Sequence, residues 1–238
     1  MKNLFLVLVL GVLSINASFA SVDHSIWNRL LKENVSSSGT VNYKGFKIKM
    51  DTLDAYIQVL RDTKPKSDWS LGERKSFYMN AYNAYTVKFL LVKYPVQSVK
   101  DASYSGKDIW HLKLVNIGGT SYTLNYLENE ILRKMNDPRI HFGINCAAQT
   151  CPKLWNRAFI AKNVNSQLTT LTKAYINNTK YNVISAKKVK LSEIFNWYAT
   201  DFTSEGKTII DYLNKYSTLT INADAKVEYL PYDWSLNE

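Results

Sequence analysis

The sequence predicts an α+β fold, in which a mainly helical single domain is built around a small antiparallel sheet. Segments with apolar residues at helical spacing outnumber the short segments in which apolar and polar residues alternate. The two kinds of segment do not follow each other in the strand–helix–strand order of a parallel α/β fold. With 46% apolar and 13% aromatic residues, the chain also has enough material for a real core, which excludes a disordered protein.

Helical patterns dominate the first half of the chain. Residues 70–94 carry apolar side chains at most positions, which is typical of a helix buried on all sides, and Pro95 ends the pattern. The elements predicted here are helix 23–35, a polar turn with a short extended piece over 36–49, helix 50–62 and helix 70–94.

Short alternating segments characterise the second half. Residues 109–124 alternate around two glycines, Gly118 and Gly119, which predicts a hairpin. The other elements predicted here are helix 123–135 with Thr123 as its cap, a strand over 139–145, a helical turn after Cys146, a short helix 152–159, helix 163–178, a hairpin over 181–192, short helices 193–202 and 208–216, and a last strand with a tail over 226–237.

The first twenty residues predict a secretory signal peptide. Lys2 gives a positive start, Leu4 to Leu13 form an apolar run, and Ser18 and Ala20 are small residues before the expected cleavage site. The run is shorter than the ~20 apolar residues of a membrane-spanning helix. We therefore expect residues 1–20 to be removed, and residues 21–238 to form an exported periplasmic or extracellular domain without a transmembrane helix. An uncleaved amino-terminal anchor is the alternative.

The net charge of +10 is spread along the chain, as in "KGFKIK" and "AKKVK". Such a distribution is typical of a solvated basic surface, and it would also attract a peptide, a cell-wall polymer or another anionic polymer. No nucleic-acid reading motif accompanies the charge, so a nucleic-acid partner is not expected. We expect no cofactor.

Both cysteines lie in one segment, "RIHFGINCAAQTCPKLW" over residues 139–155. A catalytic cysteine needs an imidazole to take its proton and a third group to orient that ring. Cys146 follows a strand-like run and precedes a turn, which is a place where side chains face a cleft. His141 lies five residues earlier and cannot reach Cys146 along a straight strand. Either the chain bends near Gly143, or the relevant imidazole is that of His111.

Two other interpretations of the cysteines stay open. In an exported protein, Cys146 and Cys151 would most naturally form a disulfide, and a turn brings residues five apart within the required separation. They could also be two inert thiols. A metal site is not expected, because no further cysteine or histidine pair completes the ligand set begun by His141 and the two cysteines.

Three polar residues outside this segment are further candidates. Asn80 and Asn83 share one face of the apolar helix 70–94, which indicates a buried hydrogen-bond network. One of them could instead orient an imidazole or stabilise an oxyanion. Glu128 is expected to be a surface or capping carboxylate, or else a partner of His141.

Five blocks of the sequence together resemble a bacterial and plant family called domain of unknown function 547. They are "FYMNAYNAYTVKFLL", "SYTLNYLENEILR", "DPRIHFGINCAAQTCPKL", "LSEIFNWYATDF" and "EYLPYDWSLN", and they run in order over nearly the whole mature chain. The family's motifs match at Asn80, Tyr82 and Asn83, and at His141, Cys146, Cys151 and Pro152. One position departs: Asn129 stands where the family often shows histidine, beside a matching Glu128. The resemblance implies a papain-like or transglutaminase-like fold.

Two functions are therefore carried forward. In the first, the protein is an exported cysteine hydrolase or acyltransferase that acts on amide bonds. Cys146 is its nucleophile, His141 exchanges the thiol proton, Glu128 or Asn83 orients the ring, and backbone amides after Cys146 stabilise the oxyanion. In the second, it is a non-catalytic exported binding domain, in which a Cys146–Cys151 disulfide braces a cleft lined by aromatic side chains.

Overall fold

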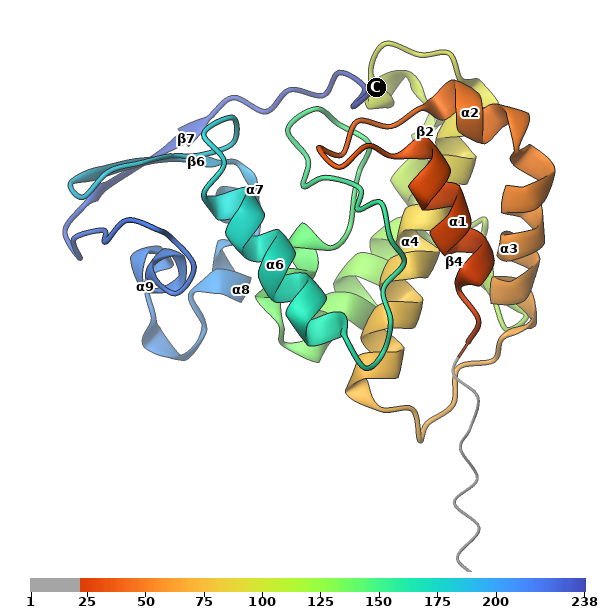
Figure 1. The fold of residues 1–238 in the computed structure, drawn as a ribbon, viewed down its shortest axis with the longest axis horizontal. Coiled ribbons are helices and arrows are strands. Elements are labelled where there is room, and N and C mark those ends of the chain that lie inside the picture. Colours follow the sequence, from red (N-terminus) through yellow and green to blue (C-terminus); the bar gives the residue numbers. More distant parts are fainter. Residues whose placement is uncertain (1–21) are drawn as a thin grey trace, which may run out of the picture.

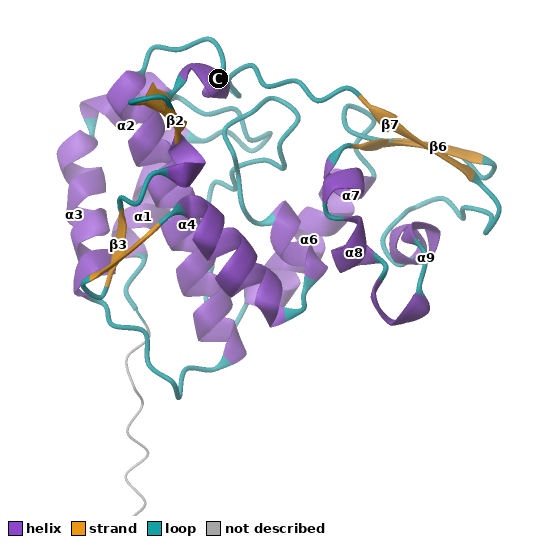
Figure 2. Ribbon diagram, turned by 180° about the vertical axis from the view of Figure 1, so that it is seen from behind, coloured by secondary structure: helices purple, strands orange, loops and turns teal. Residues whose placement is uncertain are grey.

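The computed structural model describes residues 22–238, so the predicted signal peptide lies outside the described residues. Helices gather at one end of the molecule, and a three-stranded sheet lies with short helices at the other end (Figure 1). The view from behind shows that the strands lie at the periphery while helices fill the middle (Figure 2). This mixture of helices and small sheets confirms the predicted α+β class.

Helix α4 (Leu71–Lys93) is the central element, as predicted. It begins at a capping box, in which the Ser70 side chain accepts the Glu73 amide and the Glu73 carboxylate accepts the Ser70 amide. Its apolar side chains are buried around most of its circumference, and the buried set includes the polar Asn80 and Asn83. The predicted buried helix is therefore confirmed, and it carries two amides into the core.

Helix α3 (Met50–Asp62) packs against α4, helix α1 (Ser25–Asn34) packs against α3, and both form where the periodicity predicts them. The predicted extended piece before α3 is wrong, because residues Tyr43–Ile48 form helix α2. The Asn42 side chain accepts the Gly45 amide at 2.8 Å and so caps this short helix. Tyr43 and Phe46 stand three residues apart and are both fully buried, which favours a helix over a strand here.

The strands are short, and most pair as the sequence predicts. β3 (Val115–Ile117) and β4 (Thr120–Tyr122) form the hairpin around Gly118 and Gly119, whose φ angles of 57° and 81° need glycine. β5 (Val183–Ile184) and β6 (Lys188–Ser192) form the second predicted hairpin. A further antiparallel pair, β1 (Ser103–Tyr104) and β2 (Lys107–Asp108), precedes them in the chain.

One strand departs from the predicted antiparallel sheet. β7 (Lys226–Leu230) pairs parallel to β6. The chain between these strands passes through α7 (Ile194–Trp197), α8 (Ala199–Phe202) and α9 (Ile209–Asn214). A long helical connection lets the chain return in the same direction, so a parallel pair is possible here.

The helix predicted over 123–135 is irregular. Thr123 caps it through a hydrogen bond from the Tyr126 amide at 2.9 Å, as predicted. After one α-helical turn, α5 (Leu124–Tyr126), the chain forms a π-helical turn, η3 (Leu127–Leu132), and a 3₁₀ turn, η4 (Arg133–Met135). Single π-helical turns are frequent at functional sites, and this one carries Glu128 into the interior.

The predicted strand over 139–145 is wrong. Residues Pro138–Phe142 form a 3₁₀ helix, η5. Asp137 accepts the Arg139 amide at 3.2 Å, and a proline at the first helical position favours a helix start. Ile140, Phe142 and Ile144 alternate as in a strand, but the 3₁₀ helix buries the intervening His141 as well as Ile140 and Phe142. The predicted helical turn after Cys146 and the short helix 152–159 are also absent.

The tail after β7 connects the sheet end of the molecule with the helical end. It runs back from the sheet to the helical end (Figure 1). The Val99 amide donates to the Trp234 carbonyl at 3.2 Å, and the Gln149 amide donates to the Ser235 carbonyl at 2.8 Å. These bonds pin the tail beside the segment that holds both cysteines.

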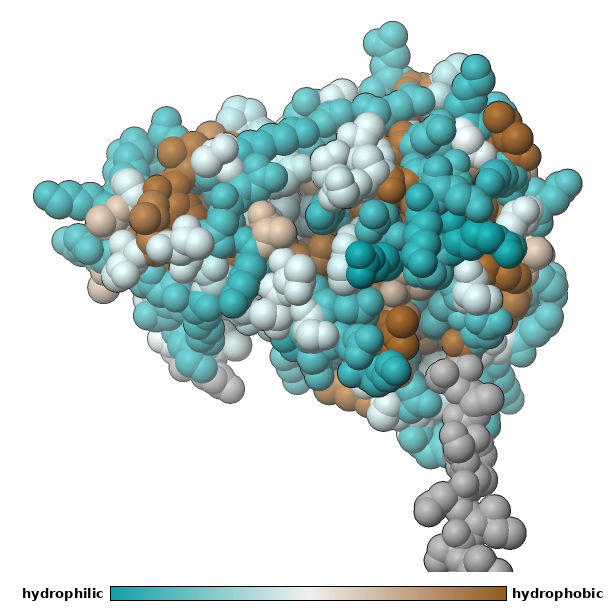
Figure 3. Space-filling model, viewed as in Figure 1, coloured by the Kyte–Doolittle hydropathy of each residue, from teal (hydrophilic) through white to brown (hydrophobic). Residues whose placement is uncertain are grey.

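The face drawn in Figure 3 is mainly hydrophilic, with apolar side chains in small separate groups. α6 (Val164–Ile176), predicted from its periodicity, lies toward this face (Figure 1). Within residues 22–238, no helix has both the length and the apolar character that a membrane span requires.

Candidate functional site

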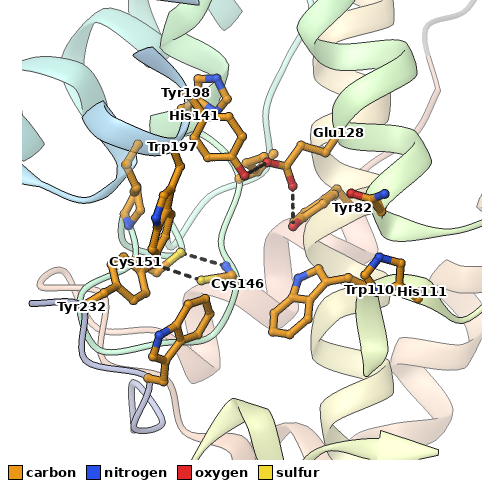
Figure 4. Close-up of a pocket in the computed structure, with 15 residues that line it drawn as sticks. Tyr82, Trp110, His111, Glu128, His141, Cys146, Cys151, Trp197, Tyr198 and Tyr232 are labelled. Carbon is orange, nitrogen blue, oxygen red and sulfur yellow. Dashed lines mark hydrogen bonds between the residues drawn. The ribbon is translucent and has the colours of Figure 1, made fainter. Parts of the chain in front are cut away.

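A cavity of about 230 Å³ contains most of the predicted site residues. It lies where α4, the π-helical turn, η5, α7 and the tail meet, and Figure 4 shows the side chains around it. Its lining comprises Tyr82, Trp110, His111, Asn125, Glu128, His141, Ile144, Cys146, Cys151, Pro152, Ile194, Trp197, Tyr198, Tyr232 and Trp234.

The two asparagines of α4 hold the surrounding backbone in place. Asn83 donates to the Gly143 carbonyl at 2.9 Å and accepts the Asn145 amide at 2.9 Å. Asn80 binds the amide and the carbonyl of Phe159 in the same way. The predicted buried network is therefore confirmed. The alternative in which Asn83 orients the His141 ring is wrong, because both ends of its amide group bind this backbone.

The predicted bend at Gly143 is present, because η5 ends there. A Cβ at this position would lie 2.8 Å from the Met79 sulfur and 2.9 Å from a Leu168 methyl group, so a larger residue would require these side chains to move. The chain therefore changes direction between His141 and Cys146, and the two residues do not lie on one straight strand.

The backbone at Cys146 is locked on both sides. Asn145 donates to the Pro152 carbonyl at 2.7 Å and accepts the Ala147 amide at 2.9 Å. Ala147 itself has a φ of 70°, a left-handed conformation that costs roughly 1–2 kcal/mol for a residue with a side chain. Strained backbone of this kind clusters at functional sites, where the surrounding structure holds it in place.

Both cysteines are free thiols, so the predicted disulfide is not formed in this structure. The Cys146 amide donates to the Cys151 sulfur at 2.9 Å, and the Cys146 sulfur lies 3.3 Å from the Tyr232 hydroxyl (Figure 4). Cys146 is half-buried and Cys151 is buried. The two thiols therefore meet different environments although they share one turn.

The two thiols differ in acidity. Burial raises the pKa of the Cys146 thiol, but hydrogen bonds from the Cys151 thiol, the Tyr232 hydroxyl and the Ala148 amide outweigh burial and bring its pKa below the ordinary value. Burial and the interaction with Cys146 raise the pKa of the Cys151 thiol well above its ordinary value. Cys146 is therefore the more reactive of the two, because the thiolate is the nucleophile.

His141 lines the same cavity but does not contact Cys146. Its ring stacks on Tyr198, with 4.1 Å between ring centres, and its Nε2 lies 2.7 Å from the Asp201 carboxylate. Figure 4 shows the ring on the far side of Tyr198 from the Cys146 sulfur. Within residues 22–238 no hydrogen bond joins the two side chains.

Asp201 is a site residue that was not predicted from the sequence. It orients the His141 ring, so the prediction that Glu128 or Asn83 would do so is wrong. Arg133 donates two hydrogen bonds of 2.7 Å to the same carboxylate. Burial raises the pKa of Asp201, but the bonds from Arg133 and His141 outweigh it and hold the pKa well below the ordinary value.

A weak signal for Asp201 was present in the sequence. Tyr198 and Asp201 are three residues apart in a helical segment, and such residues share a face. In the structure both contact the His141 ring.

His111, the other imidazole considered, lies at the rim of the cavity. It is exposed, and its Nδ1 lies 2.8 Å from the Asp108 carboxylate. Trp110 stands between His111 and Cys146 in Figure 4. His111 is therefore not placed to exchange a proton with the thiol.

Glu128 is buried, so the prediction of a surface carboxylate is wrong. The Tyr82 hydroxyl donates to one carboxylate oxygen at 3.1 Å, and the Tyr198 hydroxyl donates to the other at 2.5 Å (Figure 4). Burial and the charge of Glu128 raise the pKa of both tyrosines well above its ordinary value. The expected pairing of Glu128 with His141 is also absent, since the ring binds Asp201.

Two backbone amides of the turn at Cys146, where oxyanion donors were predicted, are already bound within the turn. The Cys146 amide donates to the Cys151 sulfur, and the Ala147 amide donates to the Asn145 side chain. The next amide, that of Ala148, faces the Cys146 sulfur itself. The first two amides therefore hold the turn, and the Ala148 amide lowers the pKa of the Cys146 thiol.

Aromatic rings form the wall of the cavity beside Cys146. The rings of Trp197 and Trp234 stack with 5.8 Å between their centres, and Tyr232 lies 4.8 Å from the first and 4.7 Å from the second. Trp110 meets Trp234 edge-on at 6.3 Å. We refer to these four residues as the aromatic wall.

Residues 66–176, about half of the chain, match the family described as Protein of unknown function, DUF547. This chain belongs to that family. The DUF547 match covers Glu128, His141 and both cysteines, and it ends before Asp201 and Tyr232. No curated protein and no solved structure matches the chain, so its likeness to papain-like or transglutaminase-like hydrolases stays a prediction. Within residues 22–238, no group of three or more histidine, cysteine or acidic side chains is arranged to hold a metal ion.

Proposed function

We propose that this DUF547 protein is a cysteine hydrolase or acyltransferase that acts on amide bonds, with Cys146 as its nucleophile. The observation that supports it most is the environment of one thiol. Cys146 faces a cavity, three hydrogen-bond donors lower its pKa, and the next residue holds a strained backbone. Cavities with perturbed titratable groups are the usual location of active sites.

The proposed reaction begins with attack of the Cys146 thiolate on the carbonyl carbon of an amide. The proton that the thiol lost when this thiolate formed is taken up by His141, and it passes from His141 to the leaving amine as the carbon–nitrogen bond breaks. Water, or an acceptor amine, then cleaves the thioester and restores the thiol. Because Tyr198 stands between sulfur and imidazole, these proton transfers run through a water molecule.

Asp201 has the role of a positioning residue in this scheme. Its hydrogen bond fixes the orientation of the His141 ring. Arg133 in turn fixes the carboxylate with two bonds. The Tyr232 hydroxyl, beside the sulfur, is the group proposed to donate to the oxyanion.

Acylation by p-nitrophenyl acetate tests the proposal without knowledge of the substrate. We expect a burst of one p-nitrophenol per protein molecule, and an acetyl group on Cys146 detected by mass spectrometry. Cys151→Ala is the matched control and keeps the burst, whereas Cys146→Ala loses it. A folded protein that shows no burst, or that carries the acetyl group elsewhere, contradicts the proposal.

The second function, a binding domain, is favoured by the aromatic wall alone, since the disulfide brace is not formed. Failure of Cys146 to acylate would select it. We also propose that the protein is exported, on the strength of the apolar run Leu4 to Leu13 and the small residues that follow it. Mass spectrometry of the periplasmic protein tests this proposal: an amino terminus at Ser21 supports it, and one at Met1 contradicts it.

A further inference from the structure

Glu128 is a buried carboxylate that forms no direct ion pair with any of the described residues, although the charge of Arg133 acts on it from further away. Among residues 22–238 no lysine or arginine forms an ion pair with it, and its partners are two tyrosine hydroxyls. Arg133, the nearby guanidinium, is bound through two hydrogen bonds to Asp201. Burial of an unpaired charge is costly, so such a group is retained where it has a role.

The Glu128 carboxylate lines the cavity and has acceptor sites that the two tyrosines do not fill. A carboxylate offers about four acceptor sites, and the Tyr82 and Tyr198 hydroxyls occupy one on each oxygen. Glu128 lines the cavity, so a bound molecule reaches the remaining sites. Tyr82 and Tyr198 also fix the direction in which these sites point, because each is buried or half-buried itself.

The aromatic wall suits a cation as well. Indole and phenol rings attract a cation over their faces, and the aromatic wall of this cavity consists of three tryptophans and a tyrosine. The chain itself gives one example: the Lys100 ammonium lies 4.7 Å from the ring centre of Trp234. Trp197 packs against Trp234 and Tyr232, and 47% of its surface stays exposed.

We propose that this cavity binds an ammonium group, and that the substrate of the site is a primary amine or a peptide with a free amino group. The ammonium donates to Glu128, and the adjoining carbon chain packs against the aromatic wall toward Cys146. This inference adds a substrate class to the proposed function. The role of the bound amine as a substrate rests on that function. The binding itself does not depend on catalysis, so the two can fail separately.

Ligand binding to the Cys146→Ala protein tests the inference. The probes are n-pentylamine hydrochloride at pH 7 and 1-pentanol, which has the same chain without the charge, and the readouts are tryptophan fluorescence and calorimetry. We expect the amine to bind roughly tenfold more tightly than the alcohol. Equal binding of both, or no binding of the amine, overturns the inference whether or not Cys146 is acylated in the wild-type protein.

Glu128→Gln assigns the binding to the carboxylate. It keeps the shape and an acceptor for the tyrosine hydroxyls, and we expect amine binding to fall roughly tenfold while alcohol binding stays unchanged. Glu130→Gln is the matched control, because Glu130 lies exposed on the same π-helical turn. Unchanged amine binding by Glu128→Gln contradicts the inference. Should that variant fail to fold, Glu128→Asp replaces it. The shorter side chain keeps the charge but places the carboxylate further from the bound ammonium, so this variant must bind the amine more weakly than Glu130→Gln.

Pentylamine also shows whether the bound ammonium group belongs to the acyl acceptor or to the acyl donor. With the wild-type protein and p-nitrophenyl acetate, added pentylamine that appears as N-pentylacetamide identifies the amine as the acyl acceptor. Pentylamine that slows acylation of Cys146 without being acetylated identifies the ammonium as part of the acyl donor. If Cys146 is not acylated at all, the proposed function fails while the amine-binding result stands.

Discussion

The two sides of the cavity are built in different ways. The cysteine side consists of a strained turn and the carboxyl-terminal tail, held together by backbone hydrogen bonds and by the thiol and phenol groups of Cys151 and Tyr232. The histidine side is held by charges: Asp201 accepts two bonds from Arg133 and one from the His141 ring. Donors therefore activate the thiol locally, while a carboxylate positions the imidazole at a distance from it.

This difference shows why proximity in the sequence does not make a catalytic pair. His141 and Cys146 are five residues apart, yet the ring binds a residue sixty positions further along the chain. The Cys146 sulfur binds a tyrosine of the tail. Variants on each side should accordingly have separate effects: changes on the cysteine side alter thiol reactivity, and changes on the histidine side alter stability and turnover.

The largest effect is expected on the reactivity of the thiols. In the wild-type protein Cys146 should react with iodoacetamide roughly a hundredfold faster than Cys151 at neutral pH, because its pKa is lowered and that of Cys151 is raised. Cys146→Ala should abolish the fast phase, which peptide mapping by mass spectrometry detects. Cys151→Ala should keep it at a lower rate, because one donor to the sulfur is lost. Equal reactivity of the two thiols would contradict the difference between their pKa values.

On the histidine side, Asp201→Asn should lower the free energy of unfolding by about 2–3 kcal/mol at pH 7, because it leaves the Arg133 charge without its partner. The pKa of Asp201 is lower in the folded protein than in the unfolded chain. Its contribution is therefore fully present above pH ~4 and is lost as the pH falls below that value.

Urea unfolding of both proteins between pH 3 and pH 7, as a rough range around the carboxyl pKa, measures this contribution. The difference between wild type and Asp201→Asn should shrink toward the acid end. Asp224→Asn, an exposed carboxylate, is the matched control and should change little. A difference that stays constant with pH would show that the carboxylate contributes by its shape and not by its charge.

Strain at the cysteine turn gives the next effect in size. Ala147→Val should cost about 2 kcal/mol, because a β-branched residue is poorly tolerated at a positive φ. Ala147→Gly should be nearly neutral, since the relief of strain offsets the lost methyl group. Ala148→Gly, at a buried neighbour without positive φ, should cost about 1 kcal/mol. Thermal unfolding that ranks the two glycine variants equally would argue against strain at Ala147.

The smallest effect is expected from a single hydroxyl. Tyr232→Phe removes one donor from the Cys146 sulfur, so the pH midpoint of alkylation should rise by roughly one unit. Tyr229→Phe, on β7, is the control and should leave the midpoint in place. A midpoint that does not move in Tyr232→Phe would mean that this hydroxyl does not stabilise the thiolate.

The sequence predicts most of the fold because its long elements have clear periodicity and caps. Helix α4 with Ser70 and the hairpin at Gly118 and Gly119 are examples. The predictions fail where short segments are controlled by distant contacts. Residues 139–145 alternate like a strand. Pro138–Phe142 nevertheless form a 3₁₀ helix, with Asp137 as its cap.

For the candidate site, the sequence likewise predicts some residues and not others. Cys146, His141 and Glu128 were found from residue types and a family resemblance, and all three line one cavity. Their partners were not found, because Asp201 and Tyr232 reach the site only through tertiary packing of α8 and the tail. No local pattern records which side chain a distant segment will bring to an imidazole or a thiol.

The pH dependence of Cys146 alkylation, measured in the wild type and in His141→Ala, tests the central claim most directly. If local donors activate the thiol, the wild-type midpoint lies below the pKa of about 8.5 of an ordinary cysteine, and His141→Ala leaves it unchanged. A wild-type midpoint at or above the ordinary value, or one that shifts when His141 is removed, would contradict the claim.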